Sequence, residues 1–361
     1  MNVAAKEYDG ENKYIRITDI DDNTHEFLTD SLTSPDIDLT GADNYKLIEG
    51  DILFARTGAS VGKSYIYRNS DGLVYYAGFL IRARIKEECD AEFVFQNTLT
   101  DRYNKYIAVT SQRSGQPGVN AQEYAEFEIK VPKKEEQTKI GTYFRNLDHL
   151  ITLHQRKCDE TKQLKKFMLQ KMFPKNGEKN PEIRFEGFTD DWEQRKLGDV
   201  FKEYSEKHHE ELPALTIVQG GGTIFREESD RSLQYDKSNL SGYKMVKKDD
   251  FIVHLRSFEG GLEKANSDGI ISPAYHTMHG DNVDSRFYYP YFRSYDFINR
   301  KLVAHVYGIR DGRSIDIDGM KSIEIPYTSY EEQKTIGDYL DSLDHLITLH
   351  QRKCEKLKEL K

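Results

Sequence analysis

"EEQTKIGTYFRNLDHLITLHQRKC", residues 135–158, returns later in the chain as "EEQKTIGDYLDSLDHLITLHQRKC", residues 331–354. Eighteen of the 24 positions are identical, and the last twelve are identical without a break. Chance does not produce a match of this length within 361 residues, so the chain contains an internal duplication. The sequence therefore predicts two copies of one structural unit.

Both repeated stretches carry apolar residues at alternating spacings of four and three, which is typical of helices that pair along a seam. We expect one helix over residues 135–173, ended by Pro174 and followed by a linker over 174–187, and a second helix over 331–361. At about 1.5 Å per residue, the first helix would be roughly 58 Å long. The residues expected to pair the helices are Ile140, Phe144, Leu147, Ile151, Ile336, Leu340, Leu343 and Ile347.

A strand-rich segment precedes each helix. "EGDILFARTG" (49–58) resembles "KDDFIVHLRS" (248–257), and "EIKVP" (128–132) resembles "SIEIP" (322–326), so each of these runs is expected to contain a strand. The fold class predicted is α/β, of the α+β type. We expect two domains, over 1–134 and 188–330, separated by two long antiparallel coiled-coil helices. The two copies would be related by a pseudo-two-fold internal repeat.

The second domain opens with "GFTDDWEQRKLGDVF", residues 187–201, which contains the only tryptophan. When the two copies are aligned, the corresponding stretch of the first copy falls before Met1. The first domain is therefore expected to be truncated at its N-terminus.

Composition limits the class of protein. Hydrophobic residues make up 37% of the chain and the mean hydropathy is −0.74, with no apolar run of membrane-spanning length, so we expect no membrane association. Cys89, Cys158 and Cys354 form no disulfide framework, which predicts a cytoplasmic protein. The net charge of −9 argues weakly against a nucleic-acid partner, but binding depends on where the basic residues lie.

"RTGASVGKSYIY", residues 56–67, resembles a phosphate-binding loop of nucleotide hydrolases. Its two glycines are one residue too close together, and the residues that follow are typical of a strand rather than a helix. The interpretation favoured is a glycine-rich hairpin between two strands. The "GGG" at 220–222 is likewise expected to form a loop or turn, and we find no methyltransferase motif, so no catalytic residue is predicted.

Three stretches together resemble the specificity subunits of type I restriction-modification systems. They are the repeated "LDHLITLHQRKC", "LKKFMLQKMFPKNGE" (164–178) and "IRFEGFTDDWEQRKLGDVF" (183–201). The resemblance covers nearly the whole chain. It implies two target-recognition domains, each reading one half of a bipartite site in double-stranded DNA. It also implies paired helices that fix the distance between the half-sites and dock two methyltransferase subunits, to which restriction-translocase subunits are added.

The resemblance further implies that this subunit is not a catalyst, although the complex methylates adenine and cleaves DNA. No cofactor is expected on this chain, while S-adenosylmethionine, ATP and Mg²⁺ are expected on the partner subunits. A truncated or silent specificity cassette that acts only as an assembly scaffold is the alternative function. An ATP-hydrolysing enzyme is a third and weaker interpretation.

Candidate DNA contacts lie on glycine-containing loops, because base edges and phosphates are contacted by Arg, Lys, Asn, Gln, Ser and Thr. The loops are the hairpin at 56–63, the stretch 110–124 and their counterparts in the second copy. The predicted DNA-binding residues are Arg56, Thr57, Ser60, Lys63, Arg113, Ser114, Gln116, Asn120, Arg256, Ser257, Tyr307, Arg310, Arg313 and Ser314.

Exposed basic residues recur in both helices as "HQRK", and we predict that Arg156, Lys157, Arg352 and Lys353 form a duplicated partner-docking surface. A solvated charged face is the alternative.

Histidine and cysteine recur at a spacing of four in both copies, which could provide four zinc ligands if the helices crossed there. A mildly polar helix seam is favoured, and no metal is predicted. Glu128, Lys130 and Asp101 resemble a nuclease site, but a salt pair on an edge strand is favoured.

Overall fold

The computed structural model describes residues 1–361 except 114, 176, 230–236, 255–260, 309–313 and the side chains of 237–239. The chain divides into two compact units. Unit 1 comprises residues 1–156 and 351–361, and unit 2 comprises residues 157–350. The proposed division into five segments is not tested by this grouping, because both unit boundaries fall inside helices.

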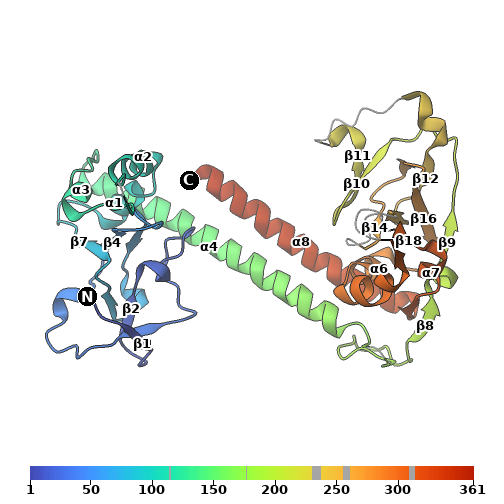
Figure 1. The fold of residues 1–361 in the computed structure, drawn as a ribbon, viewed down its shortest axis with the longest axis horizontal. Coiled ribbons are helices and arrows are strands. Elements are labelled where there is room, and N and C mark those ends of the chain that lie inside the picture. The colour runs from blue at the N-terminus through green and yellow to red at the C-terminus, as the bar shows by residue number, and fades with distance from the viewer. Residues whose placement is uncertain (114, 176, 230–236, 255–260, 309–313) are drawn as a thin grey trace. The chain divides into compact units, whose positions relative to one another are not determined.

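Unit 1 builds its domain from short strands followed by helices (Figure 1, blue to green). The central sheet is antiparallel, in the order β5-β4-β7. Two further pairs are β1 with β3, antiparallel, and β2 with β6, parallel. The elements are β1 (Ala5–Glu7), β2 (Lys13–Ile15), β3 (Thr33–Pro35), β4 (Ile52–Ala55), β5 (Ser64–Ile66), β6 (Val74–Tyr76), β7 (Leu80–Ala83), α1 (Ala91–Asn97), α2 (Asp101–Thr110), α3 (Ala121–Ala125) and the long α4 (Lys134–Lys171).

The short helices of unit 1 begin at residues whose side chains satisfy free backbone N–H groups. Asp90 caps α1 by accepting from Phe93 N, Thr100 caps α2, and Asn120 caps α3. Apolar residues of α1 and α2 pack with Ile52, Phe54 and Ile66 of the central sheet. Val61 of the turn after β4 and Val119 of the loop after α2 belong to the same cluster, so this packing holds the turn and the loop together.

Unit 2 contains the larger sheet, in the order β14-β13-β16-β9, and an aromatic core (Figure 1, yellow to orange). Phe201, Phe251, Tyr288 and Phe292 contact one another at ring-centroid distances of 5.0–5.6 Å. The elements are β8 (Glu193–Lys196), α5 (Leu197–Val200), β9 (Phe201–Tyr204), β10 (Leu215–Val218), β11 (Gly222–Phe225), β12 (Lys244–Val246), β13 (Phe251–His254), β14 (Glu263–Lys264), β15 (Gly269–Ile271), β16 (Tyr275–Gly280), α6 (Ser285–Phe292), β17 (Val306–Tyr307), β18 (Ser314–Ile315), α7 (Ile317–Lys321), β19 (Glu324–Tyr327) and α8 (Tyr330–Leu360).

The duplication extends into the domains. Buried Asp51 accepts a hydrogen bond from Ile48 N at 3.0 Å, and buried Asp250 accepts one from Lys247 N at 3.0 Å. The residue before each aspartate has a positive φ, +81° at Gly50 and +74° at Asp249. The same tight turn therefore leads into β4 in unit 1 and into β13 in unit 2.

The two long helices agree with the predicted boundaries to within two residues. In unit 2, Lys165 of α4 pairs with Asp344 of α8, and Cys158 Sγ lies 4.0 Å from the carbonyl oxygen of Ile347. Contacts of later residues in α4 are therefore with earlier residues in α8. The predicted antiparallel arrangement is confirmed.

The predicted seam residues lie on the inner side of the helices. Leu147, Ile336, Leu340 and Leu343 are buried, whereas the other four are half-buried. Ile336 and Leu340 also belong to the core of unit 2, where they pack in one cluster with Met172 at the end of α4. The seam and the domain core are thus continuous within unit 2.

One strand prediction is wrong. "SIEIP" contributes to β19, which pairs with β8 over four residues, but the matching stretch 128–132, all of it described, forms no strand. A strand needs a hydrogen-bonding neighbour, and among the described residues 128–132 pairs with no other strand, whereas β19 pairs with β8. The nuclease-like Glu128 and Lys130 accordingly lie on exposed irregular backbone rather than on an edge strand.

Candidate nucleic-acid interface

Two loops that lie far apart in the sequence meet in unit 1. The hairpin between β4 and β5 forms a β-bridge from Thr57 to Gly118, in the loop that follows α2. Val119 N donates to Arg56 O at 2.9 Å, and Gly58 N donates to Pro117 O at 3.0 Å. The hairpin at 56–63 and the loop at 111–120, which is part of the stretch 110–124 predicted as a DNA contact, therefore form one surface.

The hairpin glycines have structural roles. Gly58 and Gly62 have φ values of +78° and +87°, and a Cβ on Gly62 would lie 2.6 Å from Ile107. Tyr103 donates to Gly62 O at 2.8 Å, while the Tyr124 hydroxyl accepts from Gly62 N at 3.0 Å and donates to Ala55 O at 2.6 Å. Burial raises the pKa of Tyr124 to about 12, so this hydroxyl stays protonated as a donor. Strand β5 follows the hairpin, which confirms that it is no phosphate-binding loop.

Most predicted side chains of this surface face outward. Arg56 and Gln116 are exposed, and Thr57 and Ser60 are half-buried. Asn120 is also exposed, but its side-chain oxygen accepts from Gln122 N and Glu123 N as the cap of α3. Ser114 lies outside the described residues.

Two predicted cations are already engaged within the protein. The Lys63 side chain is only 10% exposed, and its ammonium donates to Ile20 O at 3.0 Å and pairs with Asp22. Arg113 donates to Thr110 O and Gln112 O at 2.9 and 3.0 Å and pairs with Glu123. Hydrogen bonds from Asn120 N and Arg113 lower the pKa of Glu123. The geometry favours a structural role for both cations.

One residue of this surface was missed by sequence reasoning. Phe79 is 62% exposed, and its carbonyl oxygen accepts from Arg56 N at 3.1 Å. Its sequence context, "YYAGF", is indistinguishable from that of a core aromatic. Only the exposure of the ring beside Arg56 shows that it belongs to the candidate surface, where an aromatic side chain can stack on or wedge between bases.

In unit 2, described parts of the predicted surface lie on strands β13, β17 and β18. Tyr307 is 61% exposed and pairs with Ser314 across β17 and β18. His254 ends β13, with its ring 5.0 Å from that of Tyr275. Arg256, Ser257, Arg310 and Arg313 lie outside the described residues.

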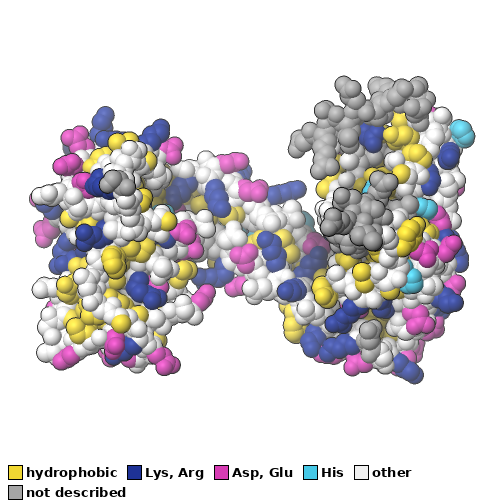
Figure 2. Space-filling view, viewed as in Figure 1, with side chains coloured by type: hydrophobic (Ala, Val, Ile, Leu, Met, Phe, Trp, Pro, Cys, Tyr) yellow, Lys and Arg dark blue, Asp and Glu magenta, His cyan; other side chains and the backbone are white. Residues whose placement is uncertain are grey.

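Charge alone does not mark a binding surface. On the face shown in Figure 2, Lys and Arg side chains are interspersed with Asp and Glu over both units. This mixture agrees with the overall acidic composition, so candidate contacts must be argued from individual residues.

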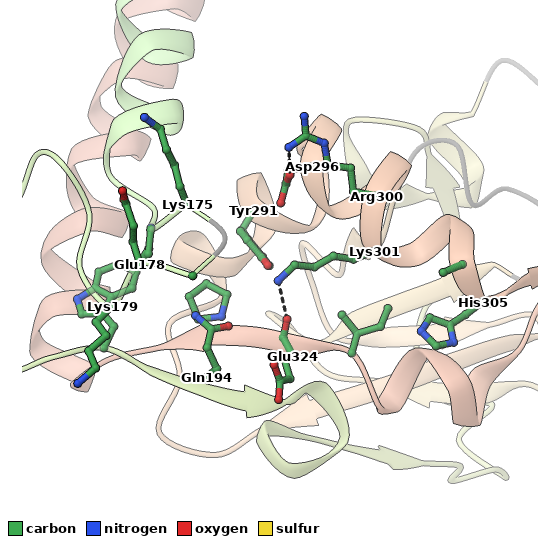
Figure 3. A pocket seen from close by; sticks show the side chains of 16 residues that line it. Lys175, Glu178, Lys179, Gln194, Tyr291, Asp296, Arg300, Lys301, His305 and Glu324 are labelled. Atoms are coloured by element: carbon green, nitrogen blue, oxygen red, sulfur yellow. Dashed lines mark hydrogen bonds and ion pairs between the residues drawn. The ribbon is translucent and has the colours of Figure 1, made fainter.

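A cavity of about 570 Å³ lies in unit 2 between the linker after α4 and the segment after α6 (Figure 3). Its basic side chains have partners. Arg300 donates to Asp296 at 3.0 Å, Lys179 pairs with Asp191 at 3.0 Å, and Lys301 donates to Glu324 O at 2.7 Å. Burial also lowers the pKa of Lys301. Because Arg300 and Lys179 are ion-paired and Lys301 is hydrogen-bonded within the protein, the cavity is a poor phosphate site.

Comparison with known proteins decides the family. Residues 2–163 and 189–359 each match the type I restriction modification DNA specificity domain. The chain belongs to this family. It is a specificity subunit of a type I restriction-modification system, the non-catalytic component that recognises the DNA sequence.

Individual relatives agree. The type I restriction enzyme MjaVIII specificity subunit of Methanocaldococcus jannaschii is 24% identical over 358 residues, covering 93% of this chain and 82% of that protein. The crystal structure of the type I restriction-modification S subunit from M. genitalium is 13% identical, with a TM-score of 0.60 over 98% of this chain and 87% of that one. The second likeness supports the fold alone.

The four residues predicted to dock partners of this specificity subunit are all exposed. Arg156 and Lys157 lie on α4, and Arg352 and Lys353 lie on α8. None of the four has a role in the buried seam.

Two of the three cysteines of the specificity subunit lie in the helix seam, and Cys89 lies outside it, before α1. Cys158 and Cys354 are buried, and Cys354 Sγ lies 3.7 Å from Gln155 Oε1. Among the residues that the structure describes, no group of three or more His, Cys, Asp or Glu side chains is placed to hold a metal ion. Over the same residues, no helix is long and apolar enough to cross a membrane.

Proposed function

We propose that the chain reads a bipartite double-stranded DNA site, one half with each unit. The observation that carries this proposal is the contact between the 56–63 hairpin and the 111–120 loop, which brings Arg56, Gln116 and Phe79 onto one surface. These side chains can bond to phosphates and base edges and contact bases through an aromatic ring. Unit 2 has diverged in the corresponding loops, as expected for a second half-site of different sequence.

The helices α4 and α8 would fix the separation of the half-sites and dock two methyltransferase subunits, through which restriction-translocase subunits join. Burial explains why three of the four paired seam positions carry the same residue in both copies, but it does not explain identical exposed residues. Arg156 and Lys157 recur as Arg352 and Lys353, all exposed, which supports a duplicated docking surface. S-adenosylmethionine, ATP and Mg²⁺ would be bound by the partners, and the complex would act in the cytoplasm.

The test is co-purification with the cognate methyltransferase, followed by mapping of methylated adenines. We expect a stable complex that methylates one two-part sequence. We also expect its DNA affinity to fall linearly with the logarithm of salt concentration, because phosphate contacts release counterions. Failure to form any complex would refute the docking surface.

An assembly scaffold is the second candidate, and one observation favours it: residues 128–132 pair with no strand among the described residues of unit 1. A scaffold would co-purify with the methyltransferase but show no preference for one DNA sequence over a scrambled duplex of equal length. A preference of about a thousandfold or more, the usual range for specific DNA binding, would exclude the scaffold.

A further inference from the structure

The turn between β10 and β11 in unit 2 is held by one buried carboxylate. Glu263, the first residue of β14, is 6% exposed. It accepts hydrogen bonds from Gly220 N at 2.8 Å and from Gly222 N at 3.2 Å. The Arg293 guanidinium and the Tyr289 hydroxyl also donate to it, the hydroxyl at 2.8 Å. The carboxylate therefore binds two backbone N–H groups of the turn and is itself held by two side chains.

A second side chain also holds this turn. Asn266 donates from its amide to Gly221 O at 2.7 Å and to Thr223 O at 2.9 Å, and its backbone N–H donates to the Thr223 hydroxyl at 2.9 Å. A Cβ on Gly222 would lie 2.5 Å from Lys264 O, so only glycine permits this close approach. The backbone of the turn is thus fixed by hydrogen bonds to β14 and to the residues that follow it.

One polar side chain of the turn has no such structural role. Gln219 is exposed, and its carboxamide has no hydrogen-bond partner among the residues that the structure describes. A carboxamide offers an acceptor oxygen and two N–H donors. Because the backbone beneath it is already ordered, binding through this side chain costs less conformational entropy than binding through a mobile loop. The turn therefore presents a free carboxamide on a fixed backbone.

Unit 1 has an equivalent turn. In unit 2, Ala214 pairs in parallel with Ile270 of β15, and in unit 1, β2 pairs in parallel with β6. These neighbours correspond, since β6 follows β5 as β15 follows β14. After this pairing the chain reverses direction in both units, through β10 and β11 in unit 2 and through the antiparallel bridge of Ile20 with Phe27 in unit 1. Residues 20–27 are therefore the counterpart of the β10–β11 hairpin.

The turn of unit 1 is also held by one charged side chain. The Lys63 ammonium donates to Ile20 O at 3.0 Å and pairs with Asp22. Asn23, the next residue, is exposed, and its carboxamide has no partner within the described part of the chain. The lysine balances the charge of Asp22 beside it, which would otherwise repel phosphates. Each unit thus exposes one free carboxamide on an anchored turn.

Both anchoring residues adjoin the connection predicted to contact DNA. β4 pairs antiparallel with β5, as β13 pairs antiparallel with β14. Lys63 is the residue before β5, and Glu263 is the first residue of β14. The two turns are therefore bonded to the same place in each unit, where the strand begins that follows the candidate DNA loop.

We propose that Asn23 and Gln219 are specificity-determining residues, one in each unit, and that each reads an adenine in the major groove. Adenine presents an N6 donor beside an N7 acceptor on that edge, and an Asn or Gln carboxamide pairs with both groups at once. Glu263 is a positioning residue for Gln219, as Lys63 is for Asn23. This inference rests on the proposed function, because it requires the chain to read DNA.

The test uses the complex of the chain with its cognate methyltransferase and a library of DNA duplexes of randomised sequence. Sequencing of the bound duplexes gives the base preference at each position. We expect the wild-type complex to enrich a two-part sequence with adenine in each part. Gln219→Ala should lower the preference for adenine about tenfold at one position of one part, the discrimination expected of one bidentate pair. Asn23→Ala should do the same in the other part.

Two further variants separate base reading from general damage. Gln170→Ala is the matched control, since Gln170 is an exposed glutamine on α4 in unit 2, and it should leave every position unchanged. Glu263→Gln replaces an acceptor oxygen by an NH₂ group that faces N–H donors. It should relax the same position as Gln219→Ala and leave the rest of that part intact, whereas a merely structural role would relax the whole part.

The outcomes distinguish this inference from the proposed function. A wild-type complex that enriches no two-part sequence would overturn both. Enrichment of such a sequence with unchanged adenine preferences in Gln219→Ala and Asn23→Ala would overturn this inference alone. Weaker binding to all sequences equally would indicate phosphate contacts instead of base reading, and the specificity role would again be wrong.

Discussion

The carboxylate of Asp148 lies 2.5 Å from Nζ of Lys361, and the same pair recurs with the helices exchanged, as Lys165 Nζ lies 2.6 Å from Asp344. Residue 148 of α4 corresponds to 344 of α8, and 165 corresponds to 361. When two copies of one helix pack antiparallel, a contact between two positions must recur with the positions swapped. The two ion pairs therefore join the same two repeat positions, with the helices exchanged. Together they are consistent with one register of the two helices.

Replacing Asp148 and replacing Asp344 should lower the free energy of unfolding by different amounts. Asp148 also accepts from the amide of buried Gln96 at 2.7 Å, whereas no such bond to Asp344 is present among the described residues. We expect Asp344→Ala to lower the free energy of unfolding of unit 2 by about 0.2–1 kcal/mol, the usual range for an exposed ion pair. Asp148→Ala should lower that of unit 1 by roughly 1–3 kcal/mol, because it leaves a buried amide unsatisfied.

Urea unfolding at low and high salt measures both effects. Lys361→Met is the control, since it removes the ion pair and leaves the Gln96 bond. Its effect should shrink at high salt as the charges are screened. Equal losses for Asp148→Ala and Lys361→Met would contradict the assigned role of Gln96.

The repeated glycine of the two helices should tolerate alanine in only one copy. A Cβ on Gly141 would lie 2.7 Å from both Asp90 Oδ1 and Phe93 N, whereas on Gly337 the nearest atoms are 3.1 Å away. We expect Gly141→Ala to destabilise unit 1 by about 1–3 kcal/mol through overpacking. Gly337→Ala should be near neutral, because alanine's helix propensity, about 1 kcal/mol better, offsets a milder contact. Thermal unfolding of the two variants decides the comparison, and a larger loss for Gly337→Ala would contradict it.

Substitutions can distinguish the residues of the candidate DNA surface in unit 1 from the residues that support it. Phe79→Ala should weaken DNA binding by about 1–3 kcal/mol if the ring stacks on a base. Because the ring is exposed, stability should stay within about 0.5 kcal/mol of wild type. Arg56→Ala should also weaken binding.

Lys63→Ala serves as the contrasting variant, because its ammonium is bound to Ile20 O and Asp22. It should lower stability and leave the salt dependence of DNA affinity unchanged. The measurements are fluorescence titrations at several salt concentrations and urea unfolding. A salt slope that drops by about one for Lys63→Ala would show a phosphate contact instead.

His25 should make the stability of unit 1 depend on pH. Its Nδ1 lies 2.8 Å from Ser64 O, and burial, followed by nearby Lys361 and Lys63, lowers its pKa below the usual 6.5. The unfolded chain therefore takes up a proton at about pH 6.5, where the native histidine stays neutral. Stability should fall as the pH drops below about 6.5.

The matched variant is His25→Asn, because asparagine tolerates the φ of +57° at this position. Urea midpoints at pH 7.5 and 5.5 should differ less for the variant than for wild type. An identical difference in the two proteins would rule out His25 as the cause.

The hydrophobic pattern and the repeat were sufficient to predict the helices, their antiparallel pairing and the β4–β5 hairpin. These features depend on local spacing: a stripe of apolar residues specifies which side of a helix is buried, and glycines between two β-rich runs specify a turn. Comparing the two copies added the alignment of the domains, since Gly50 and Asp249 occupy the same left-handed turn.

Only the tertiary structure showed which of the predicted side chains are free of partners within the protein and exposed for contact with DNA. Lys63 has the composition of a DNA contact but is engaged by Ile20 O and Asp22, which are distant in sequence. Arg113 is engaged by Glu123 at the start of the next helix, and Phe79 has the composition of a core residue but is exposed. It also decided that residues 128–132 form no strand, because a strand exists only beside a partner. The local spacing of apolar residues and glycines determines whether a segment forms a helix, a strand or a turn. The hydrogen-bond and ion-pair partners of a side chain also depend on segments that only folding brings next to it.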